Sequence, residues 1–170
     1  MCDSFKWHSS VDMLAAAADL RIHSFYYPAA IYVDKELMSL CKMTRESTEI
    51  GRESIIEAFT SNSIIIKKKN GSNITISTSP YPKMLLHYCG ENEWQKAIKL
   101  CRYIKERSLW AFLAAISLQN RKIETAEIAL ANIESIEKVN YILKLNDVPS
   151  ISRQAGLLVY FKKYSKILTT

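Results

Sequence analysis

The sequence predicts an α+β protein in which an N-terminal antiparallel β-meander, built of partial propeller blades, precedes a C-terminal α-solenoid of helix pairs. Apolar residues recur at every second position before the stretch Ser79-Pro80-Tyr81-Pro82 and at every third or fourth position after it. The dipeptide Asn70-Gly71, a strong hairpin signal, lies between two β-branched runs. In the second part, short loops separate apolar helical stripes, which favours antiparallel helix pairs. We therefore expect two parts, residues 1–80 and residues 81–170.

The composition is that of a globular chain. Of its 170 residues, 48% are hydrophobic and 24% are charged. The net charge of +6 is spread over Lys67–Lys69, Lys96–Lys105 and Lys162–Lys166, and we interpret it as solvated surface. We expect no nucleic-acid partner, because the sequence contains no aromatic-basic motif of the known binding modules.

The cysteines and the N-terminus indicate a reducing compartment. Cys2, Cys41, Cys89 and Cys101 have neither CxxC nor metal-like spacing, which predicts buried thiols. The first residues lack the apolar core of a signal peptide, and no apolar run is long enough for a membrane span. We expect a cytosolic protein without a membrane span.

Three short segments predict the first strands of the meander: Phe5–Trp7, Met13–Ala18 and Leu20–Tyr26. In the third, Leu20, Ile22, Ser24 and Tyr26 share one face. The small residues of Ala15–Ala18 suit a strand near the crowded centre of a propeller. Their helix propensity keeps a helix open as an alternative for this run.

The middle of the first part is less regular. Pro28 closes the third strand, since proline cannot donate to a ladder, and Ile31–Val33 is a candidate fourth strand. The spacing of Glu36, Leu37, Leu40 and Cys41 fits one helical turn, and the polar run Thr44–Gly51 is expected to be a loop.

Around Asn70-Gly71 we expect a two-residue type I′ turn, because both residues tolerate a positive φ. Pairing across such a turn places Ile65 opposite Ile76 and puts isoleucine on both faces, so the hairpin should be covered on both sides. The lysines Lys67–Lys69 are interpreted as a solubilising end. The strands predicted here are Ile55–Thr60, Ser63–Lys69 and Ser72–Thr78.

The junction residues Pro80, Tyr81 and Pro82 are predicted to end the last strand and begin the first helix, since proline suits a helix's first turn. Gly90 suits the position just past that helix. Asn92 with Gln95 three positions on has the capping-box arrangement for the next helix.

Apolar stripes then predict a series of helices. The residues Leu109–Leu118 are apolar nearly all round, so this helix should be buried between several neighbours. Helix-packing anchors are expected at Trp94, Ala97, Cys101, Trp110 and Ala126. The later stripes comprise Ala126, Ala129, Leu130 and Ile133, then Ile136, Val139, Ile142 and Leu143, then a last segment from Ile151 to Tyr160.

A weak internal repeat supports the helix pairs. The run Glu93–Ile98 aligns with Lys122–Glu127, with alanine in register, and Lys163–Ile167 is a candidate start of a third copy. No strict tetratricopeptide consensus is met, so the pairs are expected to be similar to tetratricopeptide repeats without matching them.

No chemistry-bearing motif is found. His8, His23 and His87 are far apart, and the nucleophile-elbow, P-loop, dinucleotide-binding and HExxH patterns are absent. We expect no catalytic residue, no cofactor, no metal and no small-molecule substrate.

Segments in order from about residue 5 to residue 150 carry a resemblance to one family. They include Asp19-Leu20-Arg21, Phe25-Tyr26-Tyr27-Pro28, Tyr32-Val33-Asp34, Ser77–Pro82, Leu100-Cys101-Arg102, Lys105-Glu106, Leu109-Trp110-Ala111, Leu113-Ala114-Ala115, Thr125–Ala129, Lys138-Val139 and Tyr141-Ile142. In these the chain resembles the intraflagellar transport protein 80 family. The resemblance implies two WD40-type propellers followed by a solenoid, of which this chain would hold a fragment: the closing blades of the second propeller and the first helix pairs.

The resemblance also implies a function. We expect a non-enzymatic scaffold segment of intraflagellar transport complex B that supports cilium assembly and anterograde transport through contacts with other subunits, at the ciliary base and axoneme. Two alternatives stay open: a nucleic-acid-binding module using Lys67–Lys69 and the basic side of the Trp94 helix, and a vesicle-coat-like scaffold.

Overall fold

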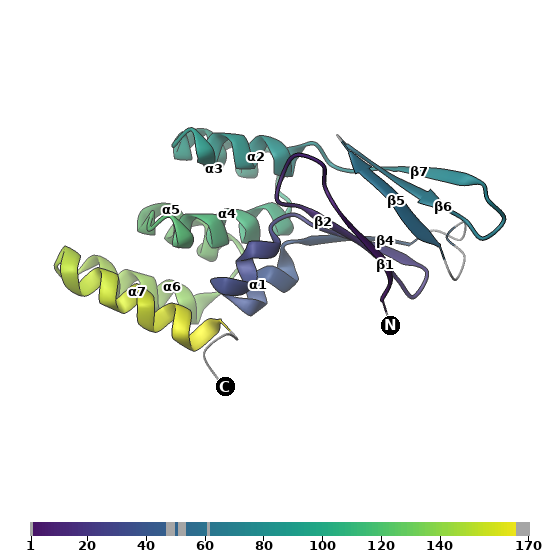
Figure 1. Ribbon diagram of the computed structural model, residues 1–170. Coiled ribbons are helices and arrows are strands. Elements are labelled where there is room, and N and C mark those ends of the chain that lie inside the picture. The colour runs from purple at the N-terminus through teal and green to yellow at the C-terminus, as the bar shows by residue number, and fades with distance from the viewer. Residues whose placement is uncertain (1, 47–49, 51–53, 61, 166–170) are drawn as a thin grey trace. The chain divides into compact units, whose positions relative to one another are not determined.

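A computed structural model describes residues 2–46, 50, 54–60 and 62–165 of the chain (Figure 1). The chain divides into two compact units, which are described separately. The β-unit comprises Met1–Pro28 and Lys42–Pro80, and the helical unit comprises Ala29–Cys41 and Tyr81–Thr170. The chain therefore passes from one unit to the other at residues 28–29, 41–42 and 80–81. Antiparallel sheets and a helical array are both present, so the predicted α+β class is confirmed.

The first sheet of the β-unit has four antiparallel strands in sequence order. These are β1 (Cys2–Trp7), β2 (Leu14–Ala18), β3 (Arg21–Phe25) and β4 (Lys42–Glu46). The alanine run is a strand, with Ala15 and Ala17 buried on the face that also buries Ile22 and Ser24. The predicted face of the third strand is therefore confirmed for Ile22 and Ser24, whereas Leu20 lies in the turn before the strand and is 47% exposed.

Two expectations for residues 28–51 are wrong. Ile31–Val33 adds no strand, because Pro28–Tyr32 forms a 3-10 helix (η1) that leads into α1 (Lys35–Leu40), the predicted helical turn. The fourth strand is β4, part of the run expected as a loop. Its polar residues pair as an edge strand allows: Thr44 Oγ1 lies 2.9 Å from His23 Nδ1. The rest of that run, 47–49 and 51, lies outside the described residues.

The second sheet comprises β5 (Ile55–Thr60), β6 (Ser63–Lys67) and β7 (Asn73–Ser77), also antiparallel. The predicted pairing of Ile65 with Ile76 is wrong by one residue, because Ile64 faces Ile76 and Ile65 faces Thr75. The turn has three residues. Its closing bonds run from Lys68 N–H to the Ser72 carbonyl (2.8 Å) and from Gly71 N–H to the Lys68 carbonyl (2.9 Å).

The longer turn changes which faces carry isoleucine. Among the residues of this turn, only Gly71 has a positive φ, 83°, as in a type I turn that ends in a left-handed residue. A shift of one residue inverts the faces of a strand. Ile64 and Ile66 consequently share one fully buried face, while Ile65 is half-buried. The expected isoleucine layer on both faces is therefore wrong, and the hairpin shows ordinary alternation.

Besides the single short helix α1, the helical unit contains three helix pairs, which Figure 1 shows as successive rows. In α4, ten consecutive residues from Leu109 to Leu118 are buried, as predicted, because α4 packs against α1, α2, α3 and α5. The paired helices are α2 (Tyr81–Gly90) with α3 (Trp94–Ile104), α4 (Arg107–Gln119) with α5 (Ile123–Asn132), and α6 (Ile136–Asn146) with α7 (Ser150–Tyr164).

The connections between these helices repeat at intervals of 29 residues. Asn92 and Arg121 have left-handed φ angles of 60° and 59°, and Lys105 and Glu134 have φ angles of 58° and 62°. The hydrogen bonds repeat too: Glu93 N–H donates to the Tyr88 carbonyl and Lys122 N–H to the Ser117 carbonyl, each at 2.8 Å. The offset equals that of the predicted alignment of Glu93–Ile98 with Lys122–Glu127.

The predicted capping box is wrong. Helix α3 begins at Trp94 after Glu93, which makes no side-chain cap hydrogen bond. Asn92 instead occupies the left-handed position of the connection, a conformation that asparagine tolerates better than most residues. The turn therefore uses the backbone freedom of Asn92 and leaves its side chain uninvolved in a cap.

The predicted stripe of α6 is wrong at two of its four residues. Ile136 is 72% exposed and Leu143 is 42% exposed, whereas Lys138, Ile142 and Leu145 are buried. A lysine thus occupies the inward face of this helix. The ion pairs described below explain why that face accepts a charge.

Candidate functional site

A charged cluster, buried except for the exposed side chain of Glu36, joins the segment Ala29–Cys41 to the last helix pair within the helical unit. Lys138 of α6 is 3% exposed, and its Nζ lies 2.6 Å from Asp34 Oδ2 and 2.7 Å from Glu36 Oε2. The hydroxyl of Tyr160, on α7, donates to Asp34 Oδ2 at 2.8 Å. We call Asp34, Glu36, Lys138 and Tyr160 the Asp34 cluster.

The remaining groups of the cluster are also satisfied. Asp34 Oδ1 accepts the N–H groups of Glu36 (2.9 Å) and Leu37 (3.4 Å), which caps α1. Lys138 Nζ lies 5.0 Å from the centre of the Tyr164 ring, within the range of a cation–π contact. A buried ion pair offsets its desolvation only with such additional hydrogen bonds, and this one has them.

Lys138 and Tyr160 keep their charge states near neutral pH. Burial lowers the pKa of Lys138, but its bonds to Asp34 and Glu36 outweigh burial and raise that pKa above its ordinary value. Burial first, and the Asp34 charge second, raise the pKa of Tyr160 far above its usual range. Neither group changes charge near neutral pH, as a general acid or base must. The cluster instead fixes Asp34 and its segment against α6 and α7.

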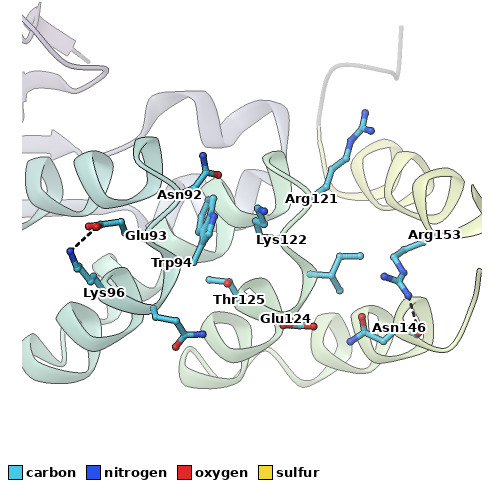
Figure 2. Close-up of a pocket in the computed structure, with 12 residues that line it drawn as sticks. Asn92, Glu93, Trp94, Lys96, Arg121, Lys122, Glu124, Thr125, Asn146 and Arg153 are labelled. Carbon is cyan, nitrogen blue, oxygen red and sulfur yellow. Dashed lines mark hydrogen bonds and ion pairs between the residues drawn. The ribbon is translucent and has the colours of Figure 1, made fainter. Parts of the chain in front are cut away.

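An open depression of the helical unit lies along one set of helix connections, and Figure 2 shows its side chains. Its volume is about 660 Å³, within the range of natural ligand sites. We call it the corner groove. Its lining residues are Asn92, Glu93, Trp94, Gln95, Lys96, Arg121, Lys122, Ile123, Glu124, Thr125, Asn146 and Arg153.

The N-termini of two helices open into the corner groove. Helices α3 and α5 begin there after Glu93 and Lys122, and neither residue makes a side-chain cap hydrogen bond. The indole Nε1 of Trp94 is buried and has no hydrogen-bond partner. The groove therefore presents uncapped backbone donors together with an unpaired indole donor.

A smaller depression lies along the opposite connections, α3–α4 and α5–α6. Its volume is about 430 Å³, and Arg107 Nη2 donates to the Ile133 carbonyl at 3.1 Å in its wall. Its lining residues are Arg102, Lys105, Arg107, Trp110, Asn132, Ile133 and Glu134. The two depressions thus use equivalent positions at opposite ends of the helix pairs.

The residues singled out by the sequence lie in three places. The five expected anchors are all buried: Trp94 at 9% exposure, Trp110 at 5%, and Ala97, Cys101 and Ala126 at 0%. Trp94 and Trp110 each also line one of the two depressions. Asn70 and Gly71 form the hairpin turn, where Asn70 Oδ1 accepts Ser72 N–H at 3.0 Å. Pro80 is the last residue of the β-unit, and Tyr81 and Pro82 begin α2.

Sequence reasoning missed the Asp34 cluster and the corner groove. More than a hundred residues separate Asp34 from Lys138, so no local pattern joins them. The groove had one usable signal, the 29-residue alignment, because equivalent turns of stacked helix pairs lie along one edge.

No cluster of metal-binding type occurs in the described part of the chain. Within it, no group of three or more His, Cys, Asp or Glu side chains is placed to hold a metal ion. His8 accepts Ser10 N–H at its Nδ1 and packs on Phe59, while His23 pairs with Thr44. No helix among these residues has the length and apolar character needed to cross a membrane.

Comparison with known proteins finds relatives along most of the chain. Residues 1–81 match the family described as IFT80 second beta-propeller, and residues 109–169 match the family described as IFT80/172/WDR35/WDR19 TPR domain. The chain is 37% identical over 161 residues to the "Intraflagellar transport protein 80 homolog" of Rattus norvegicus and equally to that of Mus musculus. These alignments cover 94% of this chain and 21% of each relative, so the chain spans about a fifth of the relatives' length.

Proposed function

This chain belongs to the intraflagellar transport protein 80 family, and we propose that it is a non-enzymatic scaffold segment of intraflagellar transport complex B. The observation that carries the proposal is the order of the two matches. A propeller match covers the strands, and a TPR match that begins at residue 109 covers the last two helix pairs, in the same order as along the chain. In this proposal residues 1–80 contribute propeller blades and residues 81–170 contribute solenoid helices.

Such a segment acts by presenting surfaces to other subunits. The helical unit is built of stacked repeats, an architecture whose extended surfaces suit binding of other proteins. In the β-unit, Phe5 and Trp7 are 63% and 51% exposed and lie two residues apart on β1, so both point to the same side of the strand. Exposed apolar side chains that gather on one face are typical of protein–protein contacts.

The role we propose is support of cilium assembly and of anterograde transport, at the ciliary base and along the axoneme. The test is co-purification of the tagged chain with candidate complex B subunits from ciliated cells, together with localisation of the tagged chain. We expect the subunits to be retained at physiological salt and the tag to lie at cilia. A chain that retains none of them and lies outside cilia contradicts the proposal.

A further inference from the structure

The corner groove has the electrostatic character of an anion-binding surface. The first backbone N–H groups of α3 and α5 have no partner inside their helices, and each helix start carries a partial positive charge. Because these starts follow equivalent 29-residue positions, two such donor sets lie along one groove. An occupant with spaced negative charges could meet both.

A second observation, independent of the helix starts, points to an acceptor in the groove. Trp94 lines it with only 9% of its surface exposed, and its Nε1 has no acceptor. In Figure 2 the indole of Trp94 is drawn near Asn92. A buried donor without a partner is costly, so an oxygen atom that reaches Nε1 is favoured.

The charged side chains of the groove favour the same occupant. Four are basic and two are acidic. Glu93 is neutralised by Lys96, at 2.6 Å, and Arg153 donates to the carbonyls of Leu145 and Asn146. Within the described residues, no ion pair engages Arg121 or Lys122, and both are exposed. These two cations are therefore available to a ligand.

The groove is shaped for a chain and not for a single ion. It extends along the α2–α3 and α4–α5 connections to Asn146 of α6 and Arg153 of α7. The exposed amides of Asn92 and Gln95 can hydrogen-bond a peptide backbone, and the lining also contains the buried apolar side chains of Trp94 and Ile123. We propose that the corner groove binds an extended acidic peptide of a partner protein, with carboxylates at Arg121, Lys122 and the Trp94 Nε1. This rests on the proposed scaffold function and names the chemistry of one partner.

The test is fluorescence anisotropy with the full chain and a short fluorescein-labelled peptide of alternating glutamate and leucine. Its glutamine counterpart is the neutral probe. The acidic peptide should bind about tenfold or more tightly than the neutral one, as hydrogen bonds to charged groups imply. R121E/K122E should weaken binding by about tenfold or more, and W94F, which keeps an aromatic ring but removes the N–H, by about tenfold.

The opposite connections supply a matched control. Lys105 has the same left-handed backbone as Arg121, with φ angles of 58° and 59°, so R102E/K105E makes the same charge change in the smaller depression. This variant should bind the acidic peptide within about twofold of the unmodified chain. Circular dichroism of each variant checks the fold, and the exposed pair R121E/K122E keeps the test valid if W94F unfolds.

Several outcomes overturn the proposal: equal binding of the glutamine peptide, unchanged affinity of R121E/K122E, an equal loss in R102E/K105E, or displacement by inorganic phosphate at the peptide's own concentration. Tighter binding of a single-stranded RNA of equal charge also overturns it. A chain that still co-purifies with its subunits but binds no acidic peptide refutes the groove alone. Failure of co-purification refutes the proposed function, and the peptide measurement then decides the groove separately.

Discussion

Replacing Lys138 by methionine should strongly destabilise the helical unit. The change keeps the length and apolar stem of the side chain but leaves Asp34, which is 1% exposed, without its countercharge at 2.6 Å. Removal of one member of a buried ion pair typically costs about 3–5 kcal/mol. Asp34 retains the Tyr160 hydroxyl and the N–H groups of Glu36 and Leu37, so we expect the lower end, about 3 kcal/mol.

The assay is urea unfolding followed by tryptophan fluorescence in a W7F background. The remaining tryptophans, Trp94 and Trp110, then both report on the helical unit. D34N/K138M should recover much of the loss, because asparagine is neutral and still caps α1. K163M is the control: Lys163 pairs with Glu137 at 2.7 Å on the surface, where ion pairs contribute little.

Two results would refute the structural interpretation of the Asp34 cluster. If K138M unfolds at the same urea concentration as the unmodified chain, the buried pair does not hold the segment Ala29–Cys41 and the structural interpretation of the cluster is refuted. The same holds if K163M is as damaging as K138M, since burial would then not be the cause.

Three further predictions follow from the same structure. The difference in unfolding free energy between the unmodified chain and K138M should be constant from neutral pH to about pH 10 and fall at higher pH. The pKa of Lys138 is raised in the folded chain, so its stabilising effect is complete below the unfolded pKa and is lost as the pH rises through the folded pKa. Urea titrations at each pH measure this difference. G156A should destabilise the helical unit by about 1–3 kcal/mol in the same assay, because the added methyl group meets Leu145 Cδ2. The control A155G, at the exposed neighbouring position, should cost about 1 kcal/mol through helix propensity alone. Unchanged stability of G156A would show that Leu145 moves aside freely. Of the four thiols, only the exposed Cys2 should react quickly with Ellman's reagent at pH 8. Burial raises the pKa of Cys89 and of Cys101 to about 12 and also raises the pKa of Cys41. Fast reaction of a second thiol in the folded chain contradicts this prediction, and all four thiols should react in urea.

Local patterns predicted most of the elements. The run Ile55–Thr60 is a strand with the predicted bounds, and Leu109–Leu118 is buried throughout, because alternation and all-round apolarity depend only on neighbouring residues. The hairpin register was not predictable in this way. Asn70-Gly71 fits a two-residue turn and a three-residue turn alike, and the choice between them moves every side chain of the strand to the other face.

The candidate sites depend on contacts that no window of sequence contains. Hydrophobic periodicity treats a lysine as solvent-facing, so the predicted stripe of α6 included Ile136, which is 72% exposed, and omitted Lys138, which is buried. A lysine can be buried only when a partner of opposite charge is supplied, and here that partner lies in another part of the chain. The corner groove likewise needs three connections to be brought together before its charges act on one ligand.

The all-round apolarity of α4 was nevertheless a signal for the segment Ala29–Cys41. In stacked helix pairs a helix contacts its partner and its neighbours and leaves one side to solvent, so a helix with ten consecutive buried residues requires cover that the pairs do not supply. That cover is α1, whose Leu37 is fully buried and which packs on α4, while Asp34 beside it binds Lys138. A fragment that begins at residue 81 therefore loses both the helix that covers α4 and the countercharge of Lys138. The helical unit depends on thirteen residues that the sequence places among the strands, and this dependence is what K138M measures.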